Sequence, residues 1–368
     1  MKRRFLICLS VLIPLVFTVF LLSCEKNYIT QVPEEHIPEY HMTYNCVFQS
    51  ETGPGYILTI NTVTHEVIDS VEYSDRNYNN LAYFDGGNKA LITDYRSLYV
   101  EDVLTHDTLA YTDRDFGGFR ISSNELYCAT IITKIFLLSL PDLGIIDSVD
   151  NSNLLPIGID GDRRILYAYY YDSSLVYAIN FSVSPSETTV VDFYDWQPNP
   201  NRKISAFLSP DNKTLLVNSE EAYGSYILVE LSTDSLSYVS EIPGQKLYSP
   251  VWTNDSKICY GVNDGNVIKY NTQTKIYSTV IDKNNIFTPD YHWDLGEGFY
   301  ATYLQLTPND KHLYIQLPPN CGGPCAGFGG HTLVYDLILQ EFIYRYDYSD
   351  YPIVCNGIMR LNPKDWSN

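Results

Sequence analysis

The stretch Leu208-Ser209-Pro210-Asp211-Asn212-Lys213-Thr214-Leu215 places a polar turn, ending in a basic residue, directly before an apolar run. Related junctions recur at Asn88-Lys89-Ala90-Leu91, Asn124-Glu125-Leu126-Tyr127, Arg163-Arg164-Ile165-Leu166, Ser256-Lys257-Ile258-Cys259 and Asp310-Lys311-His312-Leu313. The second residues of successive junctions lie 36, 39, 49, 44 and 54 positions apart. Repeats of this length are typical of propeller blades, each built from four strands.

The sequence around these junctions has the pattern of short strands. After residue 41, runs rich in Tyr, Val, Ile and Leu alternate with clusters of Asn, Asp, Gly, Ser and Pro about every eight to twelve residues, and helical periodicity is almost absent. The 33 tyrosines, 21 glycines and 19 prolines favour strands and turns. The sequence therefore predicts an all-β chain.

A third regularity sets the number of blades. The last strand of most units ends in an apolar or aromatic residue followed by aspartate, at Asp75, Asp113, Asp150, Asp195, Asp282 and Asp347. A unit ending near Pro243 lacks the aspartate and brings the endings to seven. We therefore expect a seven-bladed β-propeller of four-stranded antiparallel blades; six blades remain the alternative, because only one unit would have to merge with its neighbour.

The two ends of the repeat region predict how the ring closes. Residues 42–49, 55–61 and 66–73 supply only three strands, and Tyr56-Ile57-Leu58 matches Tyr226-Ile227-Leu228, a third strand. At the other end, residues 358–364 match the inner strand and turn at residues 206–211. Residues 353–361 should therefore pair with residues 42–49, so that the C-terminal strand completes the first blade of a propeller domain spanning residues 42–364.

The N-terminus has the features of a secretory signal. Lys2, Arg3 and Arg4 precede an apolar run over residues 5–22, and Leu21-Leu22-Ser23-Cys24 resembles the bacterial lipobox, in which the cysteine is acylated. We expect residues 1–23 to be a lipoprotein signal peptide, Cys24 to be the lipidation site and residues 24–41 to be a flexible tether. The protein would then be lipid-anchored in the bacterial cell envelope, at the outer membrane or cell surface.

The motifs Leu208-Ser209-Pro210-Asp211-Asn212-Lys213 and Leu306-Thr307-Pro308-Asn309-Asp310-Lys311 carry a family resemblance. Through them, the chain resembles the YVTN-type and TolB-like seven-bladed propellers over about residues 42–364. Those families include lactonases, binding proteins and scaffolds. The resemblance therefore implies an architecture and leaves the activity open.

Motifs for catalysis, metals and cofactors are missing. No Gly-x-Ser-x-Gly elbow is present, and the histidines are scattered at positions 36, 41, 65, 106, 292, 312 and 331. The 44 acidic and 24 basic residues give a net charge of -20, which disfavours nucleic acid as a partner. We expect no catalytic residues, no metal and no cofactor.

The cysteines divide by their surroundings. Cys321 and Cys325 flank Gly322-Gly323-Pro324, and a disulfide between them is favoured over a zinc site with His331, which would lack a fourth ligand. Cys128 and Cys259 occupy second-strand core positions and should be unpaired. Cys46 and Cys355 could clamp the closing strand, although they lie about four residues out of register.

Two long insertions should meet on one face of the ring. Residues 282–298 connect the sixth blade to the seventh, and residues 318–329 join the second and third strands of the seventh. They carry Tyr291, His292, Trp293, Asp294 and Phe328. A second cluster on that face contains Trp196 and Arg202. These are the candidate ligand-binding residues, although Trp196 and Trp293 could instead plug their loops against the body.

Two functions fit these features. The first is a non-enzymatic binding or interaction module, a surface lipoprotein whose ligand is a glycan, a peptide or an envelope protein. The alternative is a propeller-type hydrolase or lactonase whose active-site residues meet only in three dimensions. The net negative charge disfavours acidic ligands in either case.

Overall fold

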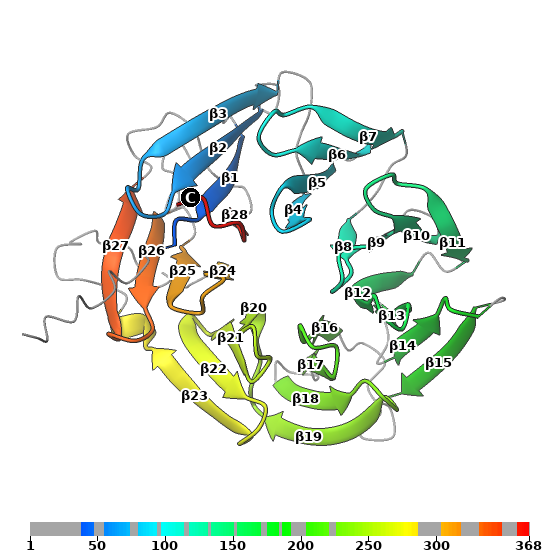
Figure 1. Cartoon of the computed structure of the whole chain (residues 1–368). Coiled ribbons are helices and arrows are strands. Elements are labelled where there is room, and N and C mark those ends of the chain that lie inside the picture. Colours follow the sequence, from blue (N-terminus) through cyan, green and yellow to red (C-terminus); the bar gives the residue numbers. More distant parts are fainter. Residues whose placement is uncertain are drawn as a thin grey trace, which may run out of the picture. The chain divides into compact units, whose positions relative to one another are not determined.

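The computed structural model describes residues 38–47, 55–73, 80–93, 97–113, 118–131, 134–150, 153–170, 175–183, 186–192, 204–220, 226–285, 303–317, 331–347 and 359–367. Contacts divide the chain into a large compact unit, Tyr40–Trp366, and a small unit of Met1–Glu39 with Ser367 and Asn368. All described strands belong to the large unit, where they form seven four-stranded sheets around a common axis (Figure 1).

Each sheet is one blade, and its strands follow one another outward from the axis. Blade 1 contains β28 (Met359–Asn362), β1 (His41–Val47), β2 (Gly55–Asn61) and β3 (Val67–Tyr73). Blade 2 contains β4 (Asn80–Phe84), β5 (Lys89–Thr93), β6 (Leu98–Asp102) and β7 (Thr108–Thr112). Blade 3 contains β8 (Phe119–Ile121), β9 (Tyr127–Ile131), β10 (Ile135–Ser139) and β11 (Ile145–Val149).

The other four blades repeat this order. Blade 4 contains β12 (Leu154–Asp160), β13 (Ile165–Tyr170), β14 (Leu175–Asn180) and β15 (Glu187–Asp192). Blade 5 contains β16 (Ile204–Leu208), β17 (Thr214–Glu220), β18 (Tyr226–Ser232) and β19 (Ser237–Pro243). Blade 6 contains β20 (Tyr248–Trp252), β21 (Ile258–Asn263), β22 (Asn266–Asn271) and β23 (Ile276–Ile281), followed by the 3-10 helix η3 (Lys283–Asn285). Blade 7 contains β24 (Tyr303–Leu306), β25 (His312–Gln316), β26 (His331–Asp336) and β27 (Glu341–Asp347).

The predicted fold class is confirmed, and the six-bladed alternative is wrong. All neighbouring strands within a blade are antiparallel, as in the pairings of blades 2 and 5. The strand β19 ends at Pro243, the one ending that the sequence pattern marks without aspartate. Among the described residues, no helix is long and apolar enough to cross a membrane.

The C-terminal strand closes the ring as predicted, but the described pairing involves Met359–Asn362 and His41–Tyr44 rather than residues 353–361 and 42–49, and residues 353–358 lie outside the described residues. The strand β28 pairs antiparallel with β1, in a register that runs from His41 opposite Asn362 to Tyr44 opposite Met359. Met42 and Met359 are fully buried in one cluster with Tyr314 and Tyr346 of blade 7. The closing strand therefore completes a sheet and also fills the core between the first and last blades.

The described residues form seven hydrophobic core clusters, one at each boundary between neighbouring blades. The middle strands are packed on both faces, which explains why β5 and β6 are almost continuously buried. Outer strands such as β7 and β11 face solvent on one side and alternate accordingly. Cys128 and Cys259 are buried and unpaired within these cores, as predicted.

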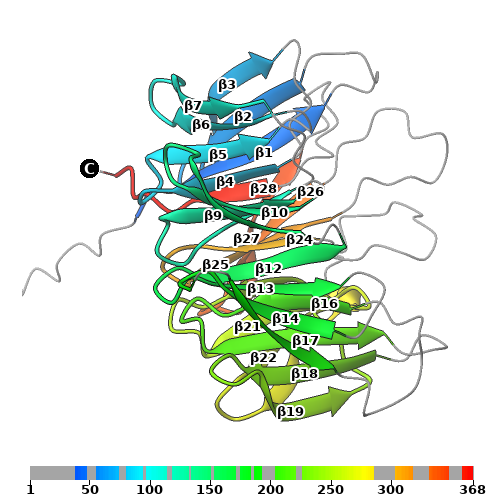
Figure 2. The same ribbon diagram turned by 90° about the vertical axis from the view of Figure 1, so that its right-hand side faces the viewer.

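The chain order gives the ring two faces. Hairpin turns between first and second strands and between third and fourth strands lie on one face, called here the turn face; they line the left side of Figure 2. Loops between second and third strands, and the connections from one blade to the next, belong to the opposite face, the loop face.

Candidate binding site at the loop-face end of the inner strands

The candidate residues predicted from the sequence lie outside the described residues. Trp196 and Arg202 fall in residues 193–203, Tyr291, His292, Trp293 and Asp294 in residues 286–302, and Cys321, Cys325 and Phe328 in residues 318–330. Cys24 and Cys355 are also outside, so lipidation and both possible disulfides stay predictions. The strand order does identify the connections: residues 286–302 lead from blade 6 into Tyr303, the first residue of β24, and residues 318–330 join β25 to β26.

Two arginines hold equivalent positions on the innermost strands. Arg120 lies in β8 of blade 3 and Arg360 in β28 of blade 1. Each is followed by one apolar residue and then by the polar residue that opens the turn, Ser122 or Asn362. Inner strands of a propeller surround its central channel, so both residues occupy the same level of the ring. They are called the arginine pair below.

The guanidinium of Arg360 is fixed across a blade boundary. Its Nε donates to the carbonyl oxygen of Leu81 at 2.8 Å, and its Nη2 donates to Oδ1 of Asn80 at 3.1 Å, both at the loop-face end of β4. Its Nη1 lies 3.3 Å from the carbonyl oxygen of Met359. The ring of Tyr303, 5.3 Å from the guanidinium carbon, adds a cation–π contact from blade 7. Arg360 is therefore held by three blades.

Arg120 is much less constrained. Its one hydrogen bond runs from Nη1 to the carbonyl oxygen of Phe119, at 2.9 Å, and its side chain is exposed. Burial by the surrounding protein nevertheless lowers its pKa, an effect that Tyr169 of β13 partly opposes.

The two charges act on each other. Burial lowers the pKa of Arg360 to about 10, and the positive charge of Arg120 contributes to this shift. A pKa in that range leaves the guanidinium protonated at neutral pH. Among the described residues, no carboxylate forms an ion pair with either arginine, so both positive charges are uncompensated within this part of the chain.

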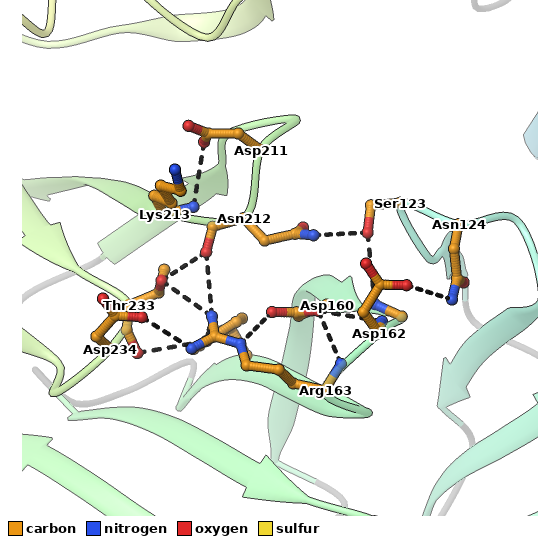
Figure 3. A network of polar contacts seen from close by, with 12 residues as sticks. Ser123, Asn124, Asp160, Asp162, Arg163, Asp211, Asn212, Lys213, Thr233 and Asp234 are labelled. Carbon is orange, nitrogen blue, oxygen red and sulfur yellow. Dashed lines mark hydrogen bonds and ion pairs between the residues drawn. The ribbon is translucent and has the colours of Figure 1, made fainter.

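On the turn face, hydrogen bonds and ion pairs connect the turns of different blades (Figure 3). Near blades 3, 4 and 5, Asn212 Nδ2 donates to Ser123 Oγ at 2.7 Å, and Asn124 Nδ2 donates to Asp162 Oδ1 at 3.2 Å. Arg163 ion-pairs with Asp160 and, at 3.0 Å, with Asp234 of blade 5. The bond between Ser123 and Asn212 joins blades 3 and 5 directly, past blade 4.

Similar bonds join the remaining blades. They are Asn362 Nδ2 to Gly87 O at 3.0 Å, Gly86 N to Glu125 Oε2 at 3.1 Å, Asp211 N to Ser256 Oγ at 3.0 Å, Asn254 N to Asp310 Oδ2 at 3.0 Å, and His65 Nδ1 with Tyr346 Oη at 2.6 Å. Every blade boundary thus has at least one polar contact that starts in a turn, which indicates a structural role for these turns.

A repeated turn chemistry makes these contacts possible. Ser209 Oγ donates to Asp211 Oδ1 at 2.7 Å, and the same carboxylate accepts the Lys213 N–H at 3.1 Å. Thr253 and Asp255 repeat the arrangement in blade 6. Side chains that satisfy the backbone of their own turn fix its shape. The polar junctions of the repeat are therefore turn-forming motifs.

The interface between blades 1 and 2 contains a pocket of about 180 Å³. It is lined by His41, Thr43, Tyr83, Glu101 and Trp366, among others, and Thr43 Oγ1 and Tyr83 Oη form a hydrogen bond across it. Burial raises the pKa of Tyr83 to about 12, so the phenol stays neutral. The volume is below the roughly 300–1,000 Å³ of pockets that enclose a typical small-molecule ligand.

In the described part of the chain, no group of His, Cys, Asp or Glu side chains is arranged to hold a metal ion. Asp160 stabilises a hairpin turn, because its Oδ1 accepts the N–H groups of Asp162 and Arg163 at 3.1 and 3.0 Å. His65 also lies in a turn, between β2 and β3, where it stacks on Tyr344 with ring centroids 3.5 Å apart.

No protein-family model matches the chain, and no curated protein sequence matches it significantly. Solved structures do resemble it. A functionally unknown protein from Desulfotomaculum acetoxidans matches with a TM-score of 0.59 at 13% identity, over 89% of this chain and 99% of that one. The β-propeller domain of Cps50 (Swd1) from Myceliophteria thermophila matches with a TM-score of 0.56 at 6% identity, over 74% and 88% of the two chains.

The third similar structure is the dihydro-heme d1 dehydrogenase NirN in complex with DHE. It matches with a TM-score of 0.51 at 10% identity, over 84% of this chain and 73% of that one. At such identities the likeness supports the propeller fold alone.

The sequence interpretation missed the arginine pair and Tyr303. A signal was present, because both arginines interrupt apolar inner strands two residues before a turn-opening Ser or Asn. Their equivalence becomes visible only when the strands Phe119–Ile121 and Met359–Asn362 are aligned as inner strands.

Proposed function

We propose that the protein is a non-enzymatic binding module that holds its ligand at the loop face of the propeller. The observation that carries this proposal is the spare hydrogen-bonding capacity of the arginine pair. Arg120 uses one of its five N–H groups within the protein and faces no described carboxylate. Ligand sites typically contain a few polar groups of this kind, whose donors no described residue engages.

The position of Tyr303 supports a link between this site and the predicted aromatic insertion. Tyr303 lies against Arg360 and directly follows residues 286–302, which carry Tyr291, His292 and Trp293. A ligand held by those aromatic residues could therefore extend to the arginine pair. On the turn face, by contrast, polar side chains such as Asn212, Asn362 and Asp310 are engaged across blade boundaries.

The ligand class that we propose is a glycan, a peptide or an envelope protein. Small-molecule binding occurs in a similar fold, because NirN was determined with DHE bound. That protein is a dehydrogenase, and at 10% identity its activity does not transfer to this chain.

The test compares binding of the full-length protein and its variants to arrays of glycans and envelope proteins. Trp293→Ala and Cys321→Ser should weaken binding, the former by about 30-fold or more if Trp293 is an anchor. Tyr238→Ala is the matched control, since Tyr238 is a 45% exposed aromatic residue on the outer strand β19. Equal binding by Trp293→Ala and wild type would place the ligand elsewhere. Chemical turnover of an array ligand would favour the hydrolase or lactonase alternative.

We also propose that acylated Cys24 anchors the protein in the bacterial cell envelope. The basic residues Lys2, Arg3 and Arg4, the apolar run and the lipobox-like Leu21-Leu22-Ser23-Cys24 support it. The tether of residues 24–41 would then leave the propeller free to meet a ligand near the membrane surface.

A further inference from the structure

We propose that Arg120 and Arg360 together bind one oxyanionic group of the ligand, a carboxylate or a phosphate, along the neighbouring inner strands β28, β4 and β8. This inference rests on the binding function proposed above and names the chemistry of one part of the ligand.

The first support is the number of donors that remain. Arginine has five N–H groups, and Arg360 uses one each on Nε, Nη1 and Nη2, which leaves one N–H on Nη1 and one on Nη2. Arg120 keeps four N–H groups because it makes a single bond, to Phe119 O. The paired N–H groups of arginine match the geometry of carboxylate and phosphate oxygens, so an oxyanion is the ligand group that fits these donors best.

The second support is the charge environment. Arg163, on the turn face, ion-pairs with two carboxylates, Asp160 and Asp234. The arginine pair has none among the described residues, although the chain contains 44 acidic and only 24 basic residues. Arg360 of β28 reaches across to β4, and β4 lies against β8, which carries Arg120. Like charges on neighbouring inner strands repel, and a bound anion would relieve that repulsion.

The third support is the fixed position of Arg360. Bonds to Leu81 and Asn80 and the ring of Tyr303 hold its guanidinium before any ligand arrives. Pre-organised donors lose little conformational entropy on binding. Arg120 keeps the freedom to adjust to the anion, so the pair combines one rigid and one mobile partner.

This conclusion differs from the expectation that the net charge of -20 disfavours acidic ligands. Charges on the surface are screened over about 8–10 Å at physiological ionic strength. Direct contacts with two guanidinium groups act at hydrogen-bond distance, which is well inside that screening length. The local charge of the site therefore decides which ligand group it accepts.

The experiment uses the detergent-solubilised full-length protein with inorganic phosphate, D-glucuronate and neutral D-glucose, in sodium chloride of matched ionic strength. Isothermal titration calorimetry and the melting temperature report binding. We expect phosphate or glucuronate, and not glucose, to bind and to raise the melting temperature. Binding to phosphate alone would indicate a phosphorylated ligand group, and binding to glucuronate alone would indicate a carboxylate.

Variants locate the site. Arg120→Gln should weaken anion binding about tenfold or more, and Arg120→Lys, which keeps the charge but loses the two-pronged geometry, should retain part of it. Arg164→Gln is the matched control, because Arg164 lies on the turn face beside Tyr127. Arg360→Gln also removes bonds between blades, so Arg120→Gln carries the test if that variant fails to fold.

Several results would overturn the inference. They are anion binding no stronger than that of glucose, equal binding by Arg120→Gln and wild type, and an equal loss in Arg164→Gln. The array experiment separates this failure from failure of the binding module. If Trp293→Ala abolishes binding of an array ligand while the anions do not bind, the oxyanion site is wrong and the binding function stands.

Discussion

The side-chain amide of Asn362 donates a hydrogen bond to the carbonyl oxygen of Gly87 at 3.0 Å, and this bond fastens the last strand of the chain to the first hairpin of blade 2. Asn362 is fully buried and also pairs with His41 in the neighbouring strand β1. The C-terminal strand is thus bonded on both sides, within its own sheet and across the next blade boundary. Closure of the ring depends on both sets of bonds.

Gly87→Ala should destabilise the protein more than Gly86→Ala. Both glycines have positive φ, +87° and +60°, so alanine is strained at either position by about 1 kcal/mol. A Cβ at Gly87 would also lie 2.0 Å from Asn362 Oδ1 and 2.9 Å from the Lys364 nitrogen, whereas Gly86 has nothing within 4 Å. We expect a total cost of about 2–4 kcal/mol for Gly87→Ala in urea unfolding. Equal losses of unfolding free energy for the two variants would contradict this account of the contact between Gly87 and the C-terminal strand.

Removal of the closing strand should destabilise the whole ring. Truncation after Tyr351 deletes β28 and uncovers Met42, which is fully buried. The milder variant Met359→Ala should cost about 2–5 kcal/mol in urea unfolding, since Met359 is also fully buried. Ile338→Ala, at a 68% exposed position in blade 7, should cost less than about 0.5 kcal/mol. An unchanged melting temperature after truncation would show that the closure is dispensable.

The closing strand shows how far the sequence can predict the fold. Local similarity between residues 358–364 and residues 206–211 was enough to place it, because each blade repeats the same local pattern. The bond from Asn212 to Ser123 had no such signal, since it joins turns 89 residues apart whose positions depend on blade rotation around the axis. Arg120 and Arg360 belong to the same case, because ring geometry rather than sequence spacing brings their strands to the two sides of β4.

Acidification should destabilise the interface between blades 7 and 1, because His65 becomes protonated there. Burial, and secondarily the charge of His312, lower the pKa of His65 below 6.5. The unfolded chain then binds more protons than the folded one just below pH 6.5, so stability present at higher pH is lost as the pH falls through that range toward the lowered pKa. We expect the melting temperature to fall between about pH 8 and about pH 5, and less steeply in His65→Gln. A proton NMR titration that places the imidazole pKa above that of an unfolded reference peptide would refute the explanation.

Cys24 should be the acylated first residue of the mature protein. Intact-mass spectrometry of the purified protein should show loss of residues 1–23 and addition of acyl chains, and Cys24→Ala should release the protein from the membrane fraction. The anchor is strong because each buried methylene contributes about 0.8 kcal/mol. Cys8→Ala is the control, since Cys8 lies within the segment to be removed. An unlipidated mature protein would remove the basis for the envelope location.

Arg163→Gln should destabilise the turn face, because the Asp160 carboxylate that it pairs with is only 5% exposed. Loss of the guanidinium leaves that charge with backbone N–H donors alone, and it also removes bonds to Asn212 O and Thr233 Oγ1 of blade 5. We expect a cost of about 2–3 kcal/mol in urea unfolding, below the maximum for a buried unpaired charge because the Arg163 side chain is 37% exposed. Asp234→Asn is the control: it breaks the other ion pair of Arg163, but Asp234 is 80% exposed and should contribute less than about 1 kcal/mol.

The double variant Asp160→Asn/Arg163→Gln should recover part of the loss, since it no longer leaves a buried charge unpaired. Equal costs for Arg163→Gln and Asp234→Asn would mean that solvent, rather than the arginine, compensates Asp160.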